Sequence, residues 1–268
     1  MPSPTPGLAV VTGARSGLGA AIAEGLRASG YHVVGTSRSV DPAWSGEWRA
    51  LELADPASVE RFLAENVDLV EQAQVWINSA GAGCCGPFAD WPADSVREQL
   101  EVLLAGPMRL SHAVFAAMSR RRSGCLVNVS SLSVEFPLPY LPVYNAAKAG
   151  LSQLSQSLLL EAPAGVSVID FQPGDFRTAF NQNMRRIGTS DSRMDRVWQH
   201  LERHLQAGPP AEAVAGVLLR AIQRGHRGRL RAGTFFQTRL APFGAGLLPP
   251  RLRRRAHLAY YGVKEIGA

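Results

Sequence analysis

Residues 8–19 read LAVVTGARSGLG, a short apolar run followed directly by Gly13, Gly17 and Gly19. A run that is apolar on both faces predicts a buried strand, and the residues after Gly19 have the spacing of an amphipathic helix. Gly13 permits a tight turn, Gly17 lets a phosphate approach the backbone, and Gly19 allows the helix to pack closely. Because a helix start supplies free amides and a positive dipole end, the stretch predicts a strand–turn–helix unit that binds the pyrophosphate of a dinucleotide.

The alternation of strand and helix continues along the chain. Four further apolar runs predict buried parallel strands, at residues 31–37, 74–81, 125–131 and 166–174. Helical patterns accompany them, at residues 17–29, 56–70, 94–120, 144–161 and 210–224. Strict alternation favours right-handed βαβ units, so we expect one α/β domain over residues 1–268, a doubly wound sheet with helices on both faces.

Three segments depart from this alternation. Residues 1–7 are expected to form a disordered leader. Residues 179–207 are polar, rich in arginine and only partly helical in pattern, as a mobile lid over a substrate would be. Residues 234–268 are apolar and then basic, and this C-terminal extension is expected either to pack on the body of the domain or to lie on a membrane.

The composition narrows the class of protein. An apolar content of 46% suffices for a sizeable core. The first residues lack the basic start and long apolar run of a signal peptide, and no uncharged apolar run reaches the roughly 18 residues that span a bilayer. We therefore expect a cytoplasmic protein. Cys84, Cys85 and Cys125 lack the spacing of a zinc site, so we expect reduced, structural thiols and no metal.

Positive charge is concentrated near the C-terminus. The net charge is +6, and the eleven Arg or Lys residues from Arg220 onward accompany a single acid, Glu265. Such an end could meet anionic lipid or an acidic carrier protein, although a solvated surface with packed apolar contacts is the interpretation we favour. It lacks the interleaved aromatics of a nucleic-acid module, so no nucleic acid is expected.

The stretch VYNAAKAG, residues 143–150, places Tyr144 and Lys148 on one face of a predicted helix. Lysine is rare here, since Lys148 and Lys264 are two of 28 basic residues. An ammonium beside a phenol stabilises the phenolate, so the pair indicates a proton-transfer site. Ser131, at the end of a predicted strand, could donate a hydrogen bond to the substrate oxygen that receives the proton of Tyr144.

Together these motifs resemble the short-chain dehydrogenase/reductase family. TGARSGLG is similar to the family's TGxxxGxG, NSAG at 78–81 to its NNAG, YNAAK at 144–148 to its YxxxK, and PGDFRT at 173–178 to its PGxxxT. Ser131 lies thirteen residues before Tyr144, as the family's serine does. The resemblance is strong over about residues 8–180. It implies a Rossmann-like fold with a mostly parallel, seven-stranded sheet, and a homodimer or homotetramer.

The resemblance also implies roles for single residues. Ser131, Tyr144 and Lys148 would be catalytic, with Tyr144 as the proton donor and Lys148 as its electrostatic partner. A nicotinamide cofactor would be held by Gly13, Arg15, Ser16, Gly17, Leu18, Gly19, Ser37, Arg38, Glu52, Leu53, Asn78, Ala80, Gly81, Tyr144, Lys148, Pro173, Gly174, Phe176 and Thr178.

Charge favours NADP(H) as that cofactor. NAD enzymes usually place an acid at the end of the second strand, where it binds the ribose 2′-hydroxyl. Here that end reads TSRS, with Ser37 and Arg38 and no carboxylate, and Arg15 projects from the glycine loop. Two cations and no anion favour a 2′-phosphate.

One position departs from the family pattern. The asparagine that completes the family's catalytic tetrad corresponds to Leu103, and residues 94–120 contain no asparagine at all. Proton resupply to Lys148 must then use another route, or the reaction is slow, or the chemistry needs no net redox turnover.

The residues expected around the substrate are apolar: Phe88, Phe136, Leu138, Tyr140, Leu141, Phe176 and Phe180. They predict a bulky hydrophobic ketone or aldehyde, or the matching secondary alcohol, of steroid, retinoid, acyl or polyketide type. The leading hypothesis is an NADP(H)-dependent oxidoreductase. The alternatives are a non-redox isomerase or cyclase of secondary metabolism on the same scaffold, and a cofactor-binding sensor or membrane-associated scaffold.

Overall fold

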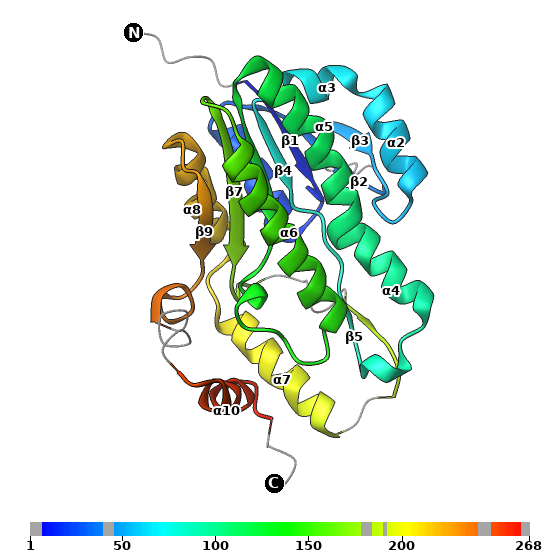
Figure 1. Cartoon of the computed structure of the whole chain (residues 1–268), viewed down its shortest axis with the longest axis vertical. Helices are drawn as coiled ribbons and strands as arrows, with labels where there is room; N and C mark the ends of the chain where they lie inside the picture. The colour runs from blue at the N-terminus through cyan, green and yellow to red at the C-terminus, as the bar shows by residue number, and fades with distance from the viewer. Residues whose placement is uncertain (1–6, 40–45, 178–183, 190–191, 241–247, 264–268) are drawn as a thin grey trace.

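A parallel sheet of seven strands forms the centre of the molecule, in the order β3-β2-β1-β4-β6-β7-β9 (Figure 1). The computed structural model describes residues 7–39, 46–177, 184–189, 192–240 and 248–263. The strands are β1 Leu8–Thr12, β2 His32–Ser37, β3 Glu47–Ala50, β4 Val75–Asn78, β6 Gly124–Val129, β7 Val166–Pro173 and β9 Gly228–Ala232. A separate pair joins β5 Cys84–Cys85 to β8 Arg185–Arg186. The predicted Rossmann-like, doubly wound single domain is confirmed.

Helices cover both faces of this sheet (Figure 1). They are α1 Gly17–Ala28, α2 Pro56–Glu65, α3 Val67–Gln72, α4 Ala93–Leu100, α5 Gly106–Arg121, α6 Pro142–Glu161, α7 Ser192–Ala207, α8 Ala211–Gln223 and α10 Pro250–Tyr260. Shorter helical segments are η1 Phe88–Asp90, η2 Glu101–Ala105, η3 Leu132–Val134 and η4 Phe236–Leu240.

Alternating residues of strand β1 belong to two hydrophobic clusters, one on each face of the sheet. Val11 belongs to the cluster beneath α1 and α8, together with Ile22 and Leu218. Val10 belongs to the opposite cluster, with Trp76 and Leu110. Both faces of β1 are therefore dry, which explains why its sequence is apolar throughout instead of alternating.

Helix α4, the π-helical segment η2 and helix α5 run on without a break from Ala93 to Arg121. This helix is long and apolar enough to cross a bilayer by length and composition alone. However, Leu110 and Val114 on it are fully buried, and α5 packs on β4 and β6. Its apolar character is accounted for by packing on the sheet, as in other buried core helices.

Several elements differ from the sequence-based expectation. The edge strands β3 and β9 were not predicted, because they are short and rich in charged residues. The single helix expected over 56–70 breaks at Asn66, whose side-chain amide donates to the Phe62 carbonyl at 2.8 Å and whose Oδ1 accepts from Arg49 at 3.1 Å. Residues 192–207 form one continuous helix, α7, where only partial helix was expected. Residues 1–6 of the expected leader lie outside the described residues.

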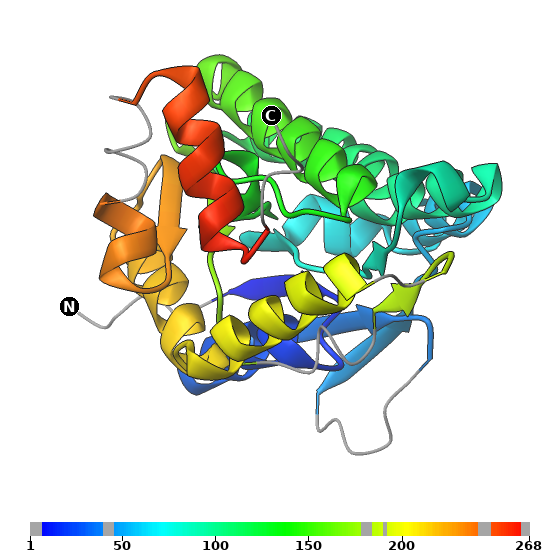
Figure 2. The ribbon, with the colours of Figure 1, turned by 90° about the horizontal axis from the view of Figure 1, so that it is seen from below.

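The carboxyl ends of the parallel strands all meet at one end of the sheet. Figure 2 looks onto this end, where α7 and α10 lie across it. In open α/β sheets ligands bind outside the carboxyl ends of the strands. The C-terminal extension thus packs on the body of the domain through α10, at the same end as the glycine loop.

Candidate active site

A cavity of about 1100 Å³ opens at the carboxyl end of the sheet. Its wall contains most of the residues that the sequence predicted for the site: Gly13, Arg15, Ser16, Gly17, Leu18, Gly19, Ser37, Arg38, Glu52, Leu53, Ala80, Gly81, Ser131, Tyr144, Lys148, Pro173, Gly174 and Phe176. The fold therefore brings together groups that are up to 163 positions apart in the sequence. Thr178 and Phe180 lie outside the described residues.

Asn78 is the predicted cofactor residue that is not part of the cavity wall. Its side chain is buried, and its Nδ2 donates to Asn128 Oδ1 at 2.8 Å and to Ser111 Oγ at 3.0 Å. These bonds tie β4 to β6 and α5 beneath the cavity. The structure thus places Asn78 as a support for the loop at 79–81, and Thr12 Oγ1 holds that loop from the other side by accepting from the Ala80 amide at 3.1 Å.

The glycine loop has the shape of a phosphate cradle. Gly13 adopts φ +70°, and a Cβ there would lie 2.6 Å from the Ala80 Cα. A Cβ on Gly19 would lie 2.3 Å from the Gly13 carbonyl oxygen. The N-cap residue of α1, Ser16, makes no side-chain capping bond, and the first turn holds no acid. The amides at the start of α1 therefore face the cavity as an anion site, so the residues present fit a dinucleotide.

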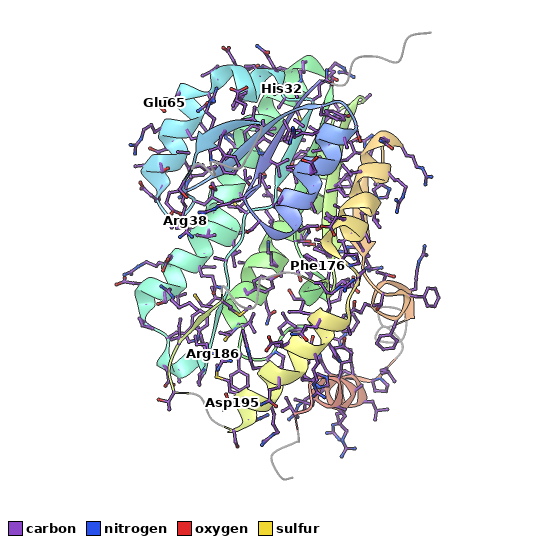
Figure 3. The ribbon with its side chains drawn as sticks, turned by 180° about the vertical axis from the view of Figure 1, so that it is seen from behind. His32, Arg38, Glu65, Phe176, Arg186 and Asp195 are labelled. Carbon is purple, nitrogen blue, oxygen red and sulfur yellow. The ribbon has the colours of Figure 1, made fainter. Side chains whose placement is uncertain are left out.

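Two guanidinium groups lie at the far end of this cradle, beyond β2. Arg15 Nη1 donates to Ser39 Oγ at 3.0 Å, and the side chain of Arg38 is 83% exposed with its Nε 4.0 Å from Glu52 Oε2. Figure 3 shows Arg38 at the carboxyl end of the sheet, with Phe176 at the same end on the far side. A bound dinucleotide would stretch between these two residues.

Ser131, Tyr144 and Lys148 meet near the middle of the cavity. Ser131 follows β6, and its Oγ accepts from the Ser133 amide at 3.0 Å. Helix α6 begins at Pro142 and carries the other two on one face, with Lys148 Nζ 5.9 Å from the centre of the Tyr144 ring. Lys148 Nζ also donates to the Val129 carbonyl at 2.7 Å, which fixes the ammonium beneath the end of β6.

Burial governs the protonation of this group. It raises the pKa of Tyr144; a hydrogen bond from Ser131 lowers that pKa and the charge of Asp175 raises it further. Burial also lowers the pKa of Lys148 to about 8, against a smaller opposite effect of Asp170. The phenol is therefore held protonated, as a proton donor must be, beside a cation that can stabilise the phenolate once the proton has left.

The buried ammonium makes a testable contribution to stability. Its pKa falls from 10.5 to about 8 on folding, so below pH 8 the charge opposes folding by about 3 kcal/mol. Between pH 8 and 10.5 the folded state has released the proton and the unfolded state has not, so stability rises with pH. Without cofactor, Lys148→Met is expected to be more stable than the wild type at pH 7, with the difference shrinking towards pH 10.5. Urea unfolding of both proteins across this range checks it; a difference that stays constant with pH would contradict it.

Leu103 is fully buried in the π-helical segment η2. A Cβ on Gly81 would lie 3.4 Å from its Cδ2, so the leucine packs directly beneath the loop at 79–81. No side-chain amide is available at this position to hold water. One helical turn beyond Lys148 lies a hydrogen-bonded cluster centred on the buried carboxylate of Asp170. Ser152 Oγ donates to Asp170 Oδ2 at 2.6 Å, and Ser130 Oγ donates to Asp170 Oδ1 at 2.5 Å.

Apolar side chains line much of the remainder of the cavity. Of the aromatic and aliphatic residues predicted here, Phe136, Leu138, Leu141 and Phe176 line it. The prediction for Phe88 is wrong, because its side chain lies outside the wall and is 58% exposed. Tyr140 belongs to the same apolar cluster as Leu141 but does not itself line the cavity.

Three helical elements, α7, η4 and α10, supply wall residues that the sequence reasoning did not name. Helix α7 and the segment before it contribute Met184, Leu201 and Leu205, while η4 and α10 contribute Phe236, Gln237, Arg253, Ala256, His257 and Tyr260. The spacing of the buried Met194, Val197 and Leu201 is a helical signal that could have revealed α7. The side chains in α10 carry no comparable signal, because Arg251 to Arg255 interrupt the pattern.

A family model described as short chain dehydrogenase matches residues 7–187. The chain belongs to this family. It is therefore an oxidoreductase by family, and the matched residues include the glycine loop, Ser131, Tyr144 and Lys148.

Individual relatives agree with the short-chain dehydrogenase assignment. A 3-ketodihydrosphingosine reductase of Bacteroides thetaiotaomicron is 32% identical over 182 residues, which cover 66% of this chain and 67% of the relative. A 3-oxoacyl-(acyl-carrier-protein) reductase of Salmonella typhimurium is 33% identical over 195 residues, covering 69% and 78%. A solved short-chain dehydrogenase from Streptomyces avermitilis superposes with a TM-score of 0.78 at 26% identity, covering 97% of both chains.

Proposed function

We propose that this short-chain dehydrogenase uses NADP(H) to reduce the ketone or aldehyde of a bulky hydrophobic substrate, or to oxidise the matching secondary alcohol. The observation that carries the proposal is the position of Ser131 and Tyr144 in one continuous cavity. On one side of them lies the anion cradle of the glycine loop, and on the other an apolar wall.

The chain's own residues divide the reaction between them. NADPH supplies the hydride when it is bound. Tyr144 gives a proton to the substrate oxygen as negative charge develops there, and Ser131 donates a hydrogen bond to the same oxygen. Lys148 stabilises the phenolate that remains and can hold the ribose hydroxyls. The apolar wall excludes water from the site where charge develops.

Charge at the end of β2 supports NADP(H) over NAD(H). Arg15 and Arg38 are both in the cavity wall. Ser37, the last residue of β2, stands where an acid would favour a free ribose hydroxyl. Glu52 is the carboxylate nearest Arg38 among the described residues, and its Oε1 is turned to the Ala54 amide at 2.8 Å. A 2′-phosphate would thus meet two guanidinium groups.

The volume and lining of the cavity support a large apolar substrate. About 1100 Å³ is enough for a dinucleotide together with a sizeable second ligand. Two relatives are named for long-chain or acyl ketones, a ketodihydrosphingosine and a 3-oxoacyl group. We propose that α7 and the segment before it act as the substrate lid, because Met184, Leu201 and Leu205 close this side of the cavity.

A spectrophotometric screen tests the proposal. Purified protein is mixed with NADPH or NADH and a panel of hydrophobic ketones, with small polar ketones as the control set. We expect loss of NADPH absorbance with hydrophobic ketones only. Product formed without a change in NADPH would instead support the non-redox isomerase or cyclase, which the missing asparagine at Leu103 favours. Turnover of small polar ketones alone would overturn the substrate assignment.

A further inference from the structure

A second polar cluster faces the same cavity from the side of α7 and α10. Its centre is Asp175, two residues after β7. Asp175 Oδ2 accepts from Gln237 Nε2 at 2.5 Å, lies 3.5 Å from the Tyr260 hydroxyl, and lies 3.9 Å from His204 Nδ1. The ring of His200 lies against that of His204, with centroids 4.3 Å apart. Four separate segments of the chain therefore converge on one carboxylate.

These contacts use only one oxygen of the Asp175 carboxylate, Oδ2. Within the described part of the chain no hydrogen bond to Oδ1 is found. Asp175, Gln237 and Tyr260 all belong to the cavity wall, and the Asp175 side chain keeps 23% of its surface exposed. A ligand in the cavity can thus reach the carboxylate.

The surroundings leave this negative charge poorly compensated. Phe176, Leu201 and Phe236 line the cavity nearby in the chain's fold, and among the described residues the ion-pair partner of Asp175 is a histidine, which is charged only when protonated. Burial raises the pKa of the Asp175 carboxyl, while Gln237 and His204 act in the opposite direction. A carboxylate in an apolar cavity is costly unless a cation or strong donor meets it.

The charge also acts on the proton donor. Asp175 raises the pKa of Tyr144, and both residues belong to the wall of the same cavity. A cation bound at Asp175 would cancel this effect and make the Tyr144 proton easier to transfer. Recognition of a positive charge would then be coupled to the chemistry.

We propose that Asp175 binds an ammonium group of the substrate, so that the natural substrates are hydrophobic amino ketones or the matching amino alcohols. This inference rests on the proposed carbonyl reduction and names the substrate class for it. Gln237, Tyr260 and His204 are positioning residues that hold the carboxylate towards the cavity. The apolar wall takes the hydrocarbon part of the same molecule.

The test compares matched long-chain ketones, with an amino group one to three carbons from the carbonyl or with none. With NADPH and the wild-type protein, the best amino ketone is expected to exceed the plain ketone in kcat/KM by about 10- to 100-fold, the range of a charge-assisted hydrogen bond. Asp175→Asn is expected to remove this preference, so that kcat/KM for the amino ketone falls to the value for the plain ketone in the same variant.

Two further variants separate charge from packing. Asp175→Glu keeps the charge and should retain part of the preference. Tyr260→Phe removes one positioning contact without changing charge and should weaken the preference less than Asp175→Asn does. Equal kcat/KM for plain and amino ketones in the wild type would overturn the inference while leaving the proposed reductase intact, and this result needs no variant to fold. Equal loss on both substrates in Asp175→Asn would also overturn it. Reduction of no ketone at all would instead refute the proposed function.

Discussion

Tyr144→Phe is expected to lower kcat/KM for ketone reduction by about 10²- to 10⁴-fold, the range that a positioned general acid contributes. The variant loses one hydroxyl and keeps the ring that packs beside Lys148. Burial holds the phenol protonated, and the phenol is hydrogen-bonded with Ser131, so the variant lacks the proposed proton donor. NADPH binding, measured by fluorescence titration, should change by less than about 3-fold, since the cradle lies at the glycine loop.

Tyr140→Phe is the matched control for this experiment. Tyr140 lies four residues earlier, packs in the same apolar cluster as Tyr144 and does not line the cavity. Its variant should keep kcat/KM within about 3-fold of the wild type. If Tyr144→Phe kept more than about a tenth of the wild-type rate, Tyr144 would not be the acid and the proposed chemistry would have to be reassigned.

Removing both guanidinium groups at the end of β2 is expected to change the cofactor preference by about 100-fold. Arg15→Ala with Arg38→Ala deletes two charge-assisted contacts to a 2′-phosphate, each of about 10-fold. The loss should fall on kcat/KM for NADPH, with kcat/KM for NADH nearly unchanged, since NADH has no phosphate there. Adding Ser37→Asp should shift the preference further to NADH, because a carboxylate can bind the ribose hydroxyl and repels a phosphate.

Arg97→Ala is the control for general charge loss. Arg97 is 73% exposed, pairs with Asp94 on the surface, and does not line the cavity. Arg97→Ala should leave kcat/KM unchanged for both NADPH and NADH. A wild-type protein that used NADH better than NADPH, or a double variant with an unchanged preference, would show that the two arginines do not read the phosphate.

Part of this site was predictable because its signals are local. Tyr144 and Lys148 share a helical face because they are four residues apart. Gly13 and Gly19 stand where a Cβ would collide with backbone atoms, and the presence of glycine at both positions is visible in the sequence. Predicted strands and helices end within a few residues of the observed ones, since strongly apolar parallel strands have little freedom in where they end. The edge strands β3 and β9 were not predicted, because they contain charged residues and an edge strand need not be apolar.

Other features of the site were not predictable from local signals. Phe88 was expected in the cavity because it follows the loop at 79–86, yet η1 turns it out to solvent. Leu103 could be aligned with the family's asparagine, but the π-helical turn that carries it has no signature in EVLLAG. The spacing of apolar residues in a helical sequence does not reveal whether one turn is π-helical.

By itself the sequence determined the family, the parallel sheet, the phosphate cradle and the trio of Ser131, Tyr144 and Lys148. Those features depend on short-range spacing and on strand order, which a sequence carries directly. Only the tertiary structure decided what closes the cavity and what faces the substrate. Asp175 meets Gln237 and Tyr260 across 62 and 85 positions of sequence. Contacts over such separations leave no periodic trace in the chain, because they arise only when η4 and α10 pack over the strand ends.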